Sequence, residues 1–111
     1  MTIFQKIIDG EVPCDNLYED DDVLVFRDIA PQAPFHALVV PKKPIRSMAE
    51  TDRQDQELLG KVMLVAAAVA RDHGLEKNGY RLVTNIGEHG GQTVFHLHVH
   101  ILGGRMLRGM G

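Results

Sequence analysis

Three histidines alternate with apolar residues between Phe95 and Leu102, and this alternation constrains the fold more than any other feature of the chain. Successive side chains of a β-strand point to opposite faces, so His96, His98 and His100 would share one face and the apolar residues the other. At helical spacing, His98 would point away from the other two histidines. The pattern therefore predicts a strand with one apolar face and one row of imidazoles.

This row of imidazoles predicts a chemical site. A polar row on a sheet costs stability unless water or hydrogen bonds satisfy it, and imidazole titrates near neutral pH. A merely solvated strand face is the plain alternative. Such faces usually mix Thr, Lys, Glu and Arg rather than repeating one residue type, so the repetition favours a functional site.

Zinc binding is the main chemical alternative, because three protein ligands and one open position make a catalytic zinc site. Alternate residues of a strand lie about 6.6 Å apart, so at most two of these imidazoles can reach one ion at about 2 Å. A zinc site would then require His36 or a carboxylate, and no Asp or Glu lies between Gly90 and Gly111. We expect neither a metal nor a cofactor, and zinc is the second interpretation.

Composition predicts one domain over residues 1–111. The net charge is −3 and the basic residues are dispersed, so the chain has no electrostatic footprint for nucleic acid. The single Cys14 excludes an intrachain disulfide and fits a reducing, cytoplasmic location. The first residues lack the pattern of a signal peptide, and the longest apolar run, 62–70, is too short to span a bilayer. We therefore expect a cytoplasmic protein without a nucleic-acid or membrane partner.

Capping signals predict two helices. Thr2 caps a short helix with apolar residues at helical spacing, and Gly10 ends it. Thr51 and Gln54 form a capping box for one long helix, which ends at His73 before a glycine. The long helix has a broad apolar stripe that must be covered, which predicts packing against a sheet.

The remaining segments predict an antiparallel sheet in an α+β fold. An acidic turn at 20–22 joins the first two strands as a hairpin, and a proline-containing loop at 28–34 precedes the third. Besides the histidine segment, the expected strands are 16–19, 23–27, 35–40 and 80–84. The alternation of the third strand places His36 on one face with Leu38 and Val40, which makes it a candidate fourth imidazole.

The glycine-rich segment 87–93 precedes the histidine strand and predicts an anion site by its position. Glycines let backbone N–H groups approach an anion closely. Gln92 and Thr93 add side-chain donors beside the histidines. We therefore expect this loop to bind phosphate.

Residues 91–102 closely resemble the signature of the histidine triad (HIT) superfamily of nucleotide-binding proteins and hydrolases. Nearly the whole chain resembles the Hint branch of that superfamily. The other matching segments are Ile3-Phe4, Lys6 to Ile8, Glu11 to Pro13, Asp28 to Pro34 before His36, Val40 to Lys43 and Leu102 to Arg105. The resemblance implies a HIT-like fold, with a mainly antiparallel five-stranded sheet, one long helix and a short N-terminal helix.

The resemblance also assigns roles to the histidines. His98 would be the nucleophile on the α-phosphorus of a nucleotide, and His100 would bind the phosphate oxygens. His96 and His36 would support and orient the site, and Thr93 would position or protonate the leaving group. A neutral imidazole nitrogen suits the first role, because a covalent nucleotidyl-histidine splits one difficult displacement into two easier ones.

Other residues would bind the nucleotide according to the same resemblance. Asp28 would accept hydrogen bonds from the ribose hydroxyls, a task that suits an ionised carboxylate. Asn85 would lie beside the phosphate, and Gly91 and Gln92 would help to hold it. The residues expected to enclose the purine are Ile3, Phe4, Ile7, Phe26 and Ile29, of which Ile7 and Phe26 could equally be ordinary core.

The activity implied is metal-free hydrolysis of purine nucleoside phosphoramidates, with release of AMP or GMP. A dinucleoside polyphosphate hydrolase uses the same triad but lacks the N-terminal segment 3–13 found here. A nucleotide-binding regulatory protein is an alternative of a different class. The resemblance further implies a homodimer formed through the long helix and an edge strand.

Overall fold

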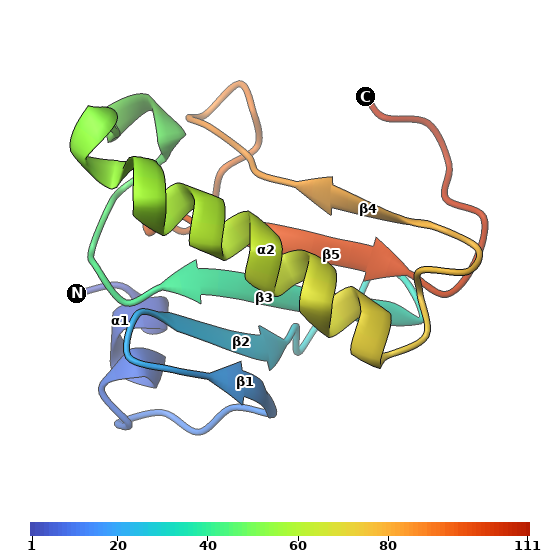
Figure 1. The fold of residues 1–111 in the computed structure, drawn as a ribbon. Helices are drawn as coiled ribbons and strands as arrows, with labels where there is room; N and C mark the ends of the chain where they lie inside the picture. The colour runs from blue at the N-terminus through green and yellow to red at the C-terminus, as the bar shows by residue number, and fades with distance from the viewer.

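The computed structural model describes all residues, 1–111, and contains one antiparallel sheet covered by helices on both faces (Figure 1). The five strands lie in the order β1-β2-β3-β5-β4. In chain order the elements are α1 (Ile3–Ile8), β1 (Asn16–Glu19), β2 (Val23–Arg27), β3 (Phe35–Pro41), the 3₁₀ turns η1 (Met48–Glu50) and η2 (Arg53–Asp55), α2 (Gln56–Asp72), β4 (Tyr80–Val83) and β5 (Val99–Gly103). The predicted α+β fold is confirmed.

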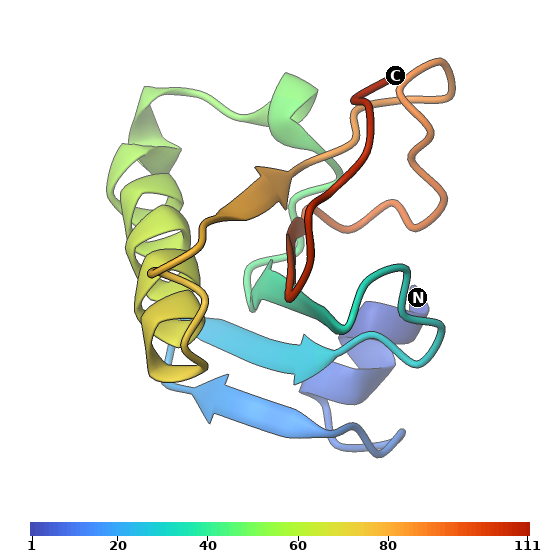
Figure 2. The ribbon, with the colours of Figure 1, turned by 90° about the vertical axis from the view of Figure 1, so that its right-hand side faces the viewer.

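The sheet separates two apolar clusters, and Figure 2 shows α2 on one side of it and α1 on the other. The larger cluster lies under α2 and contains the odd-numbered residues of β3, such as Ala37 and Val39. The smaller cluster lies under α1 and contains Leu38 and Val40. The predicted alternation of β3 is therefore confirmed, and it places His36 on the sheet face opposite α2.

The histidine segment differs from the prediction, because the strand begins only at Val99. Leu97 donates its backbone N–H to the carbonyl of Ile45, so this stretch approaches the chain beyond β3 instead of continuing the ladder. Phe95 is 39% exposed and lies outside both apolar clusters. Its ring centroid is 5.1 Å from the Arg46 guanidinium carbon. The predicted apolar face is therefore wrong at Phe95.

The start of the long helix also differs from the prediction. Thr51 is the C-cap of η1, and its hydroxyl donates to the carbonyl of Met48. Asp52 and Asp55 form a capping box one residue further along, for η2, and α2 then begins at Gln56. An ionised carboxylate accepts backbone N–H bonds more strongly than a hydroxyl, which explains the choice of Asp52 over Thr51.

The N-terminal helix and the hairpin form as predicted. The Thr2 hydroxyl caps α1 by accepting the N–H of Gln5. The acidic turn between β1 and β2 has no glycine, and Asp20 stabilises it by accepting the N–H groups of Asp22 and Val23. No helix of the structure has both the length and the apolar character needed to cross a bilayer.

Candidate active site

A cavity of about 400 Å³ is lined by half of the predicted site residues. It is lined by Asp28, Ala30, Gln32, His36, Val83, Asn85, Gly91, Thr93, His98, His100 and Leu102. A larger cavity of about 630 Å³ lies between residues 74–81 and 104–107, but no histidine or carboxylate lines it. The smaller cavity is therefore the candidate active site.

The register of β3 and β5 brings the fourth imidazole to the site. Leu38 pairs with His100, and His36 pairs with Leu102, so the two histidines are diagonal neighbours on one face. The Nε2 atom of His36 lies 2.9 Å from Nδ1 of His100. The ring of His98 lies beside that of His100, with 5.1 Å between the ring centroids. Three imidazoles thus form one connected group.

The hydrogen bond of His98 determines which of its nitrogens is free. Its Nδ1 lies 2.7 Å from the backbone carbonyl oxygen of His96. Because a carbonyl can only accept, Nδ1 carries the proton and Nε2 keeps its lone pair. The ring also packs against Phe4 in an edge-to-face arrangement, with 4.9 Å between the ring centroids. In the neutral ring of His98, Nε2 is therefore the unprotonated nitrogen.

His96 supports the site without lining the cavity. It is buried, and its Nε2–H donates to the carbonyl of Pro41, the last residue of β3, at 2.8 Å. This bond attaches the segment before β5 to the end of β3. The supporting and orienting role expected for His96 agrees with this geometry, since its carbonyl holds the ring of His98.

The hydrogen bonds of His36 determine a second tautomer. The backbone N–H of Gln32 donates to Nδ1 of His36 at 3.0 Å, so the proton of the neutral ring is on Nε2. That Nε2–H donates to Nδ1 of His100, which leaves an N–H on Nε2 of His100. His100 can therefore donate to an anion in the cavity. Sequence reasoning missed Gln32, because its contribution is a backbone N–H and no residue type signals it.

A zinc site does not fit this arrangement. Asp28, His36 and His100 offer ligand atoms within 4.8 Å of one another. A histidine that binds a metal normally donates its other ring N–H to an acceptor. The other ring nitrogen of His36 instead receives the N–H of Gln32, so its Nε2 has no lone pair for an ion. The donor set therefore does not support the zinc interpretation.

Burial keeps these imidazoles neutral. Desolvation lowers the pKa values of His98 and His36, and it lowers the pKa of His100 to about 4 with help from the neighbouring His98 and His36. The Asp28 carboxylate opposes these shifts only in part. At neutral pH the candidate site therefore has a neutral His98 with an unprotonated Nε2 and a neutral hydrogen-bond donor in His100.

We predict that acid destabilises the protein through these histidines. Their pKa values are lowered by folding, so between about pH 6.5 and about pH 4 the unfolded chain binds more protons than the folded one. The free energy of unfolding, measured with urea, should be greatest above about pH 6.5 and should fall as the pH drops through that window. The fall should be shallower in His100→Gln and unchanged in His89→Gln, a control in an exposed loop. Equal slopes in all three proteins would contradict the prediction.

The glycine-rich loop is closed by Gln92, which corrects one expectation. The side chain is 6% exposed, and its Oε1 accepts the N–H of Gly87. Its amide N–H groups donate to the carbonyls of Arg46 and Val94. Both donors are therefore used within the protein, and Gln92 does not line the cavity. Gln92 is a structural residue of the loop rather than a phosphate ligand.

The cavity-lining residues of this region agree with the expectation. Gly91, Thr93 and Asn85 line the cavity, and Asn85 also donates to the carbonyl of Gly90. Asp28 lines it too, although one carboxylate oxygen accepts the N–H of Ala30. Its other oxygen lies 3.5 Å from Nε2 of His36. These residues bring polar groups to the same cavity as His98 and His100.

The predicted purine-binding residues divide into two groups. Phe4 and Phe26 are buried in the smaller apolar cluster, with ring centroids 5.6 Å apart, and Ile7 packs against them. Phe4 and Phe26 therefore belong to the core, Ile7 is half-buried, and their contact with a base stays a prediction. Ile3 and Ile29 are exposed, so they remain available to a ligand.

Comparisons with known proteins agree with the fold. Over residues 9–107 the chain matches the HIT domain, and it belongs to that family. It is 47% identical over 106 residues to the purine nucleoside phosphoramidase of Escherichia coli K12. The aligned residues cover 96% of this chain and 89% of that protein. The resemblance seen in the sequence is therefore confirmed.

Solved structures give the same result. A HIT family hydrolase from Legionella pneumophila has a TM-score of 0.95 and 44% identity, covering 97% of this chain and 96% of that one. A histidine triad nucleotide-binding protein from Candida albicans has a TM-score of 0.83 and 27% identity, covering 100% of this chain and 86% of that one.

Proposed function

We propose that this protein hydrolyses the P–N bond of purine nucleoside 5′-phosphoramidates and releases AMP or GMP. One observation carries the proposal, namely the hydrogen bond from Nδ1 of His98 to the carbonyl of His96, which leaves Nε2 as a neutral nucleophile at the cavity. The relative from E. coli, named a purine nucleoside phosphoramidase, supports the choice of substrate.

The reaction has two displacements at the α-phosphorus. In the first, Nε2 of His98 attacks phosphorus, the P–N bond breaks, and the amine leaves after taking up a proton from solvent that Thr93 helps to position. In the second, water attacks the same phosphorus, breaks the bond to His98 and gives a proton to solvent. The His96 carbonyl stabilises the imidazolium that forms, and the Nε2–H of His100 stabilises the phosphoryl oxygens.

Nucleotide binding uses the remaining cavity residues. Asp28 accepts from the ribose hydroxyls, because its carboxylate has lone pairs beyond those used by the loop. Asn85 and Gly91 lie beside the phosphate, and the exposed side chains of Ile3 and Ile29 offer apolar surface to the base. The reducing setting that fits a lone Cys14 makes the cytoplasm the proposed location.

Steady-state release of AMP from adenosine 5′-phosphoramidate, with and without a chelator, tests this proposal. We expect release that survives chelation and that exceeds release from a diadenosine polyphosphate under the same conditions. Activity lost on chelation would support the zinc interpretation. A preference for the diadenosine compound would favour a dinucleoside polyphosphate hydrolase. Binding of AMP without turnover of either substrate would favour the regulatory alternative.

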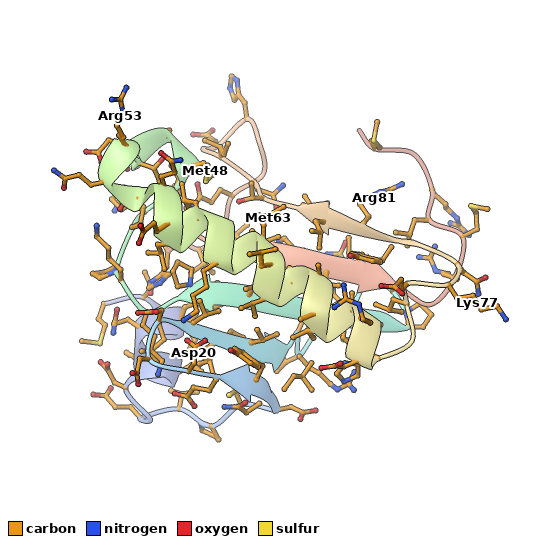
Figure 3. The ribbon with its side chains drawn as sticks, viewed as in Figure 1. Asp20, Met48, Arg53, Met63, Lys77 and Arg81 are labelled. Atoms are coloured by element: carbon orange, nitrogen blue, oxygen red, sulfur yellow. The ribbon has the colours of Figure 1, made fainter.

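We also predict a homodimer formed through β4 and α2. β4 is an edge strand of the sheet, so one side of its backbone is unpaired. Leu64 of α2 is 74% exposed, and Met63, which Figure 3 shows on the side of α2 toward β4 in that view, is also exposed. A small domain gains stability by burying such apolar surface against a second copy.

Sedimentation equilibrium at micromolar concentration should give twice the protomer mass of 12.3 kDa. Leu64→Glu should shift the mass toward the protomer, because it places a charge in the interface. Ile29→Glu is the matched control, since it introduces the same charge at an exposed aliphatic residue outside α2 and β4. A monomeric wild type would contradict the prediction.

A further inference from the structure

We propose that Arg105, which lies outside the candidate active site, positions His100 through a relay that runs over Gln32 and His36. The inference concerns the phosphate-binding role of His100 and so rests on the proposed function. The relay joins the chain beyond β5 to the loop 28–34 and then to the neighbouring strands β3 and β5.

Three consecutive hydrogen bonds form the relay. The Nη2 group of Arg105 donates to the carbonyl of Gln32 at 3.1 Å. The backbone N–H of the same Gln32 donates to Nδ1 of His36 at 3.0 Å. Nε2 of His36 then donates to Nδ1 of His100 at 2.9 Å. Each of these donors has a defined acceptor, so the position of one backbone unit, Gln32, determines the tautomers of two histidines.

The loop has few other attachments that could hold Gln32 in place. Pro31 and Pro34 have no N–H to donate. Within residues 29–34, the only other hydrogen bond is the one from the N–H of Ala30 to Asp28. The position of Gln32 therefore depends on its two partners, Arg105 on its carbonyl side and His36 on its amide side.

Close packing provides a second contact between the same two segments. Gly104 adopts φ +96°, and a Cβ placed on it would lie 2.8 Å from the Cβ of Pro34, closer than real side chains approach. The turn after β5 therefore lies directly against the end of the loop. This contact places the Arg105 backbone where its guanidinium reaches Gln32.

Loss of the Arg105 bond should allow His36 and His100 to exchange between their two tautomers. Without a fixed Gln32 N–H, Nδ1 of His36 can carry the proton, and Nε2 then no longer donates to His100. His100 would exchange between tautomers, and its Nε2 would carry a proton only part of the time. The donor to the phosphoryl oxygens would be missing in that fraction of molecules.

Long-range ¹H–¹⁵N spectra of the histidine rings, recorded without substrate, test the relay. The wild type should show the protons of His36 and His100 on Nε2. In Arg105→Met both rings should show averaged nitrogen shifts, while His98, held by the carbonyl of its own segment, should keep its proton on Nδ1. Gly104→Ala should have the same effect on His36 and His100, because it pushes Pro34 away.

Arg108→Met is the matched control, because Arg108 is exposed and has no hydrogen bond or ion pair. It should leave all three ring tautomers as in the wild type. Arg105→Met should reduce kcat/KM for the phosphoramidate about three- to tenfold, the effect of losing one hydrogen bond of ordinary net strength. Arg108→Met should not change it.

Several results would overturn the relay. Unchanged ring shifts of His36 and His100 in Arg105→Met would do so whatever the activity, and so would a wild-type proton on Nδ1 of His36. An equal change at His98 would show general loosening instead of a directed relay. Altered tautomers with unchanged kcat/KM would remove the link to phosphate binding. If the wild type shows the expected tautomers but does not cleave the phosphoramidate, the proposed function fails and the hydrogen-bonded relay stands.

Discussion

His98→Ala should abolish AMP release from adenosine 5′-phosphoramidate, with a loss in kcat on the order of 10⁴- to 10⁶-fold, as expected when an active-site nucleophile is removed. The reason is specific to one atom. Nε2 of His98 is unprotonated because Nδ1 donates to the His96 carbonyl, and no other imidazole of the cavity presents an unprotonated nitrogen that is not already used as an acceptor. His36 and His100 cannot take over the role.

Two further measurements separate catalysis from binding in that variant. Mass spectrometry after a neutral quench should detect one adenylyl group on the wild type during turnover and none on His98→Ala. Calorimetric titration with AMP should still show binding to the variant, because Asp28 and His100 remain. His89→Ala, in the exposed loop, is the control and should retain activity. Equal activity of His98→Ala and the wild type would remove His98 as the nucleophile.

Ile101→Ala should cause the largest loss of stability that we predict, about 2–5 kcal/mol in the free energy of unfolding. Ile101 is 0% exposed and belongs to the apolar cluster under α2. It also lies on β5, between β3 and β4, so its surroundings are held by two ladders and cannot easily collapse into the space left. The deletion therefore removes transfer free energy and leaves a cavity.

Urea denaturation at neutral pH and one fixed protein concentration measures this loss, since dimerisation would make the apparent stability depend on concentration. Ile101→Val is the matched control and should lose only about 0.5–1.5 kcal/mol, because it removes a single buried methyl group. A loss below about 1 kcal/mol in Ile101→Ala would show that the strand is not a rigid part of the core.

The alternation of apolar residues and histidines correctly predicted the two faces of β5. In β5, alternation placed Val99 and Ile101 in the core and His100 on the opposite face, and the structure has this arrangement. The same argument failed at Phe95. Alternation assigns side chains to faces only while the strand has a paired neighbour, and here the neighbouring β4 ends at Val83.

Just beyond the end of β4, a side chain continues the contact with the histidine segment. The hydroxyl of Thr84 donates to the carbonyl of His98 at 2.9 Å. Further back, the segment contacts the chain after β3 through Leu97 and Ile45. Local periodicity contains no information about either partner, so the irregular path before β5 could not be predicted.

The sequence by itself determined the order of helices and strands, the α+β class, the family and the polar residues of the cavity other than Gln32, because these depend on local spacing and on residue type. Only the tertiary structure decided how those residues function. The register of β3 against β5 placed His36 beside His100, and the path of the loop brought the Gln32 N–H to His36. Proton positions on imidazoles depend on which donors and acceptors surround them, and in this protein those partners are backbone groups from distant segments, which residue type does not reveal.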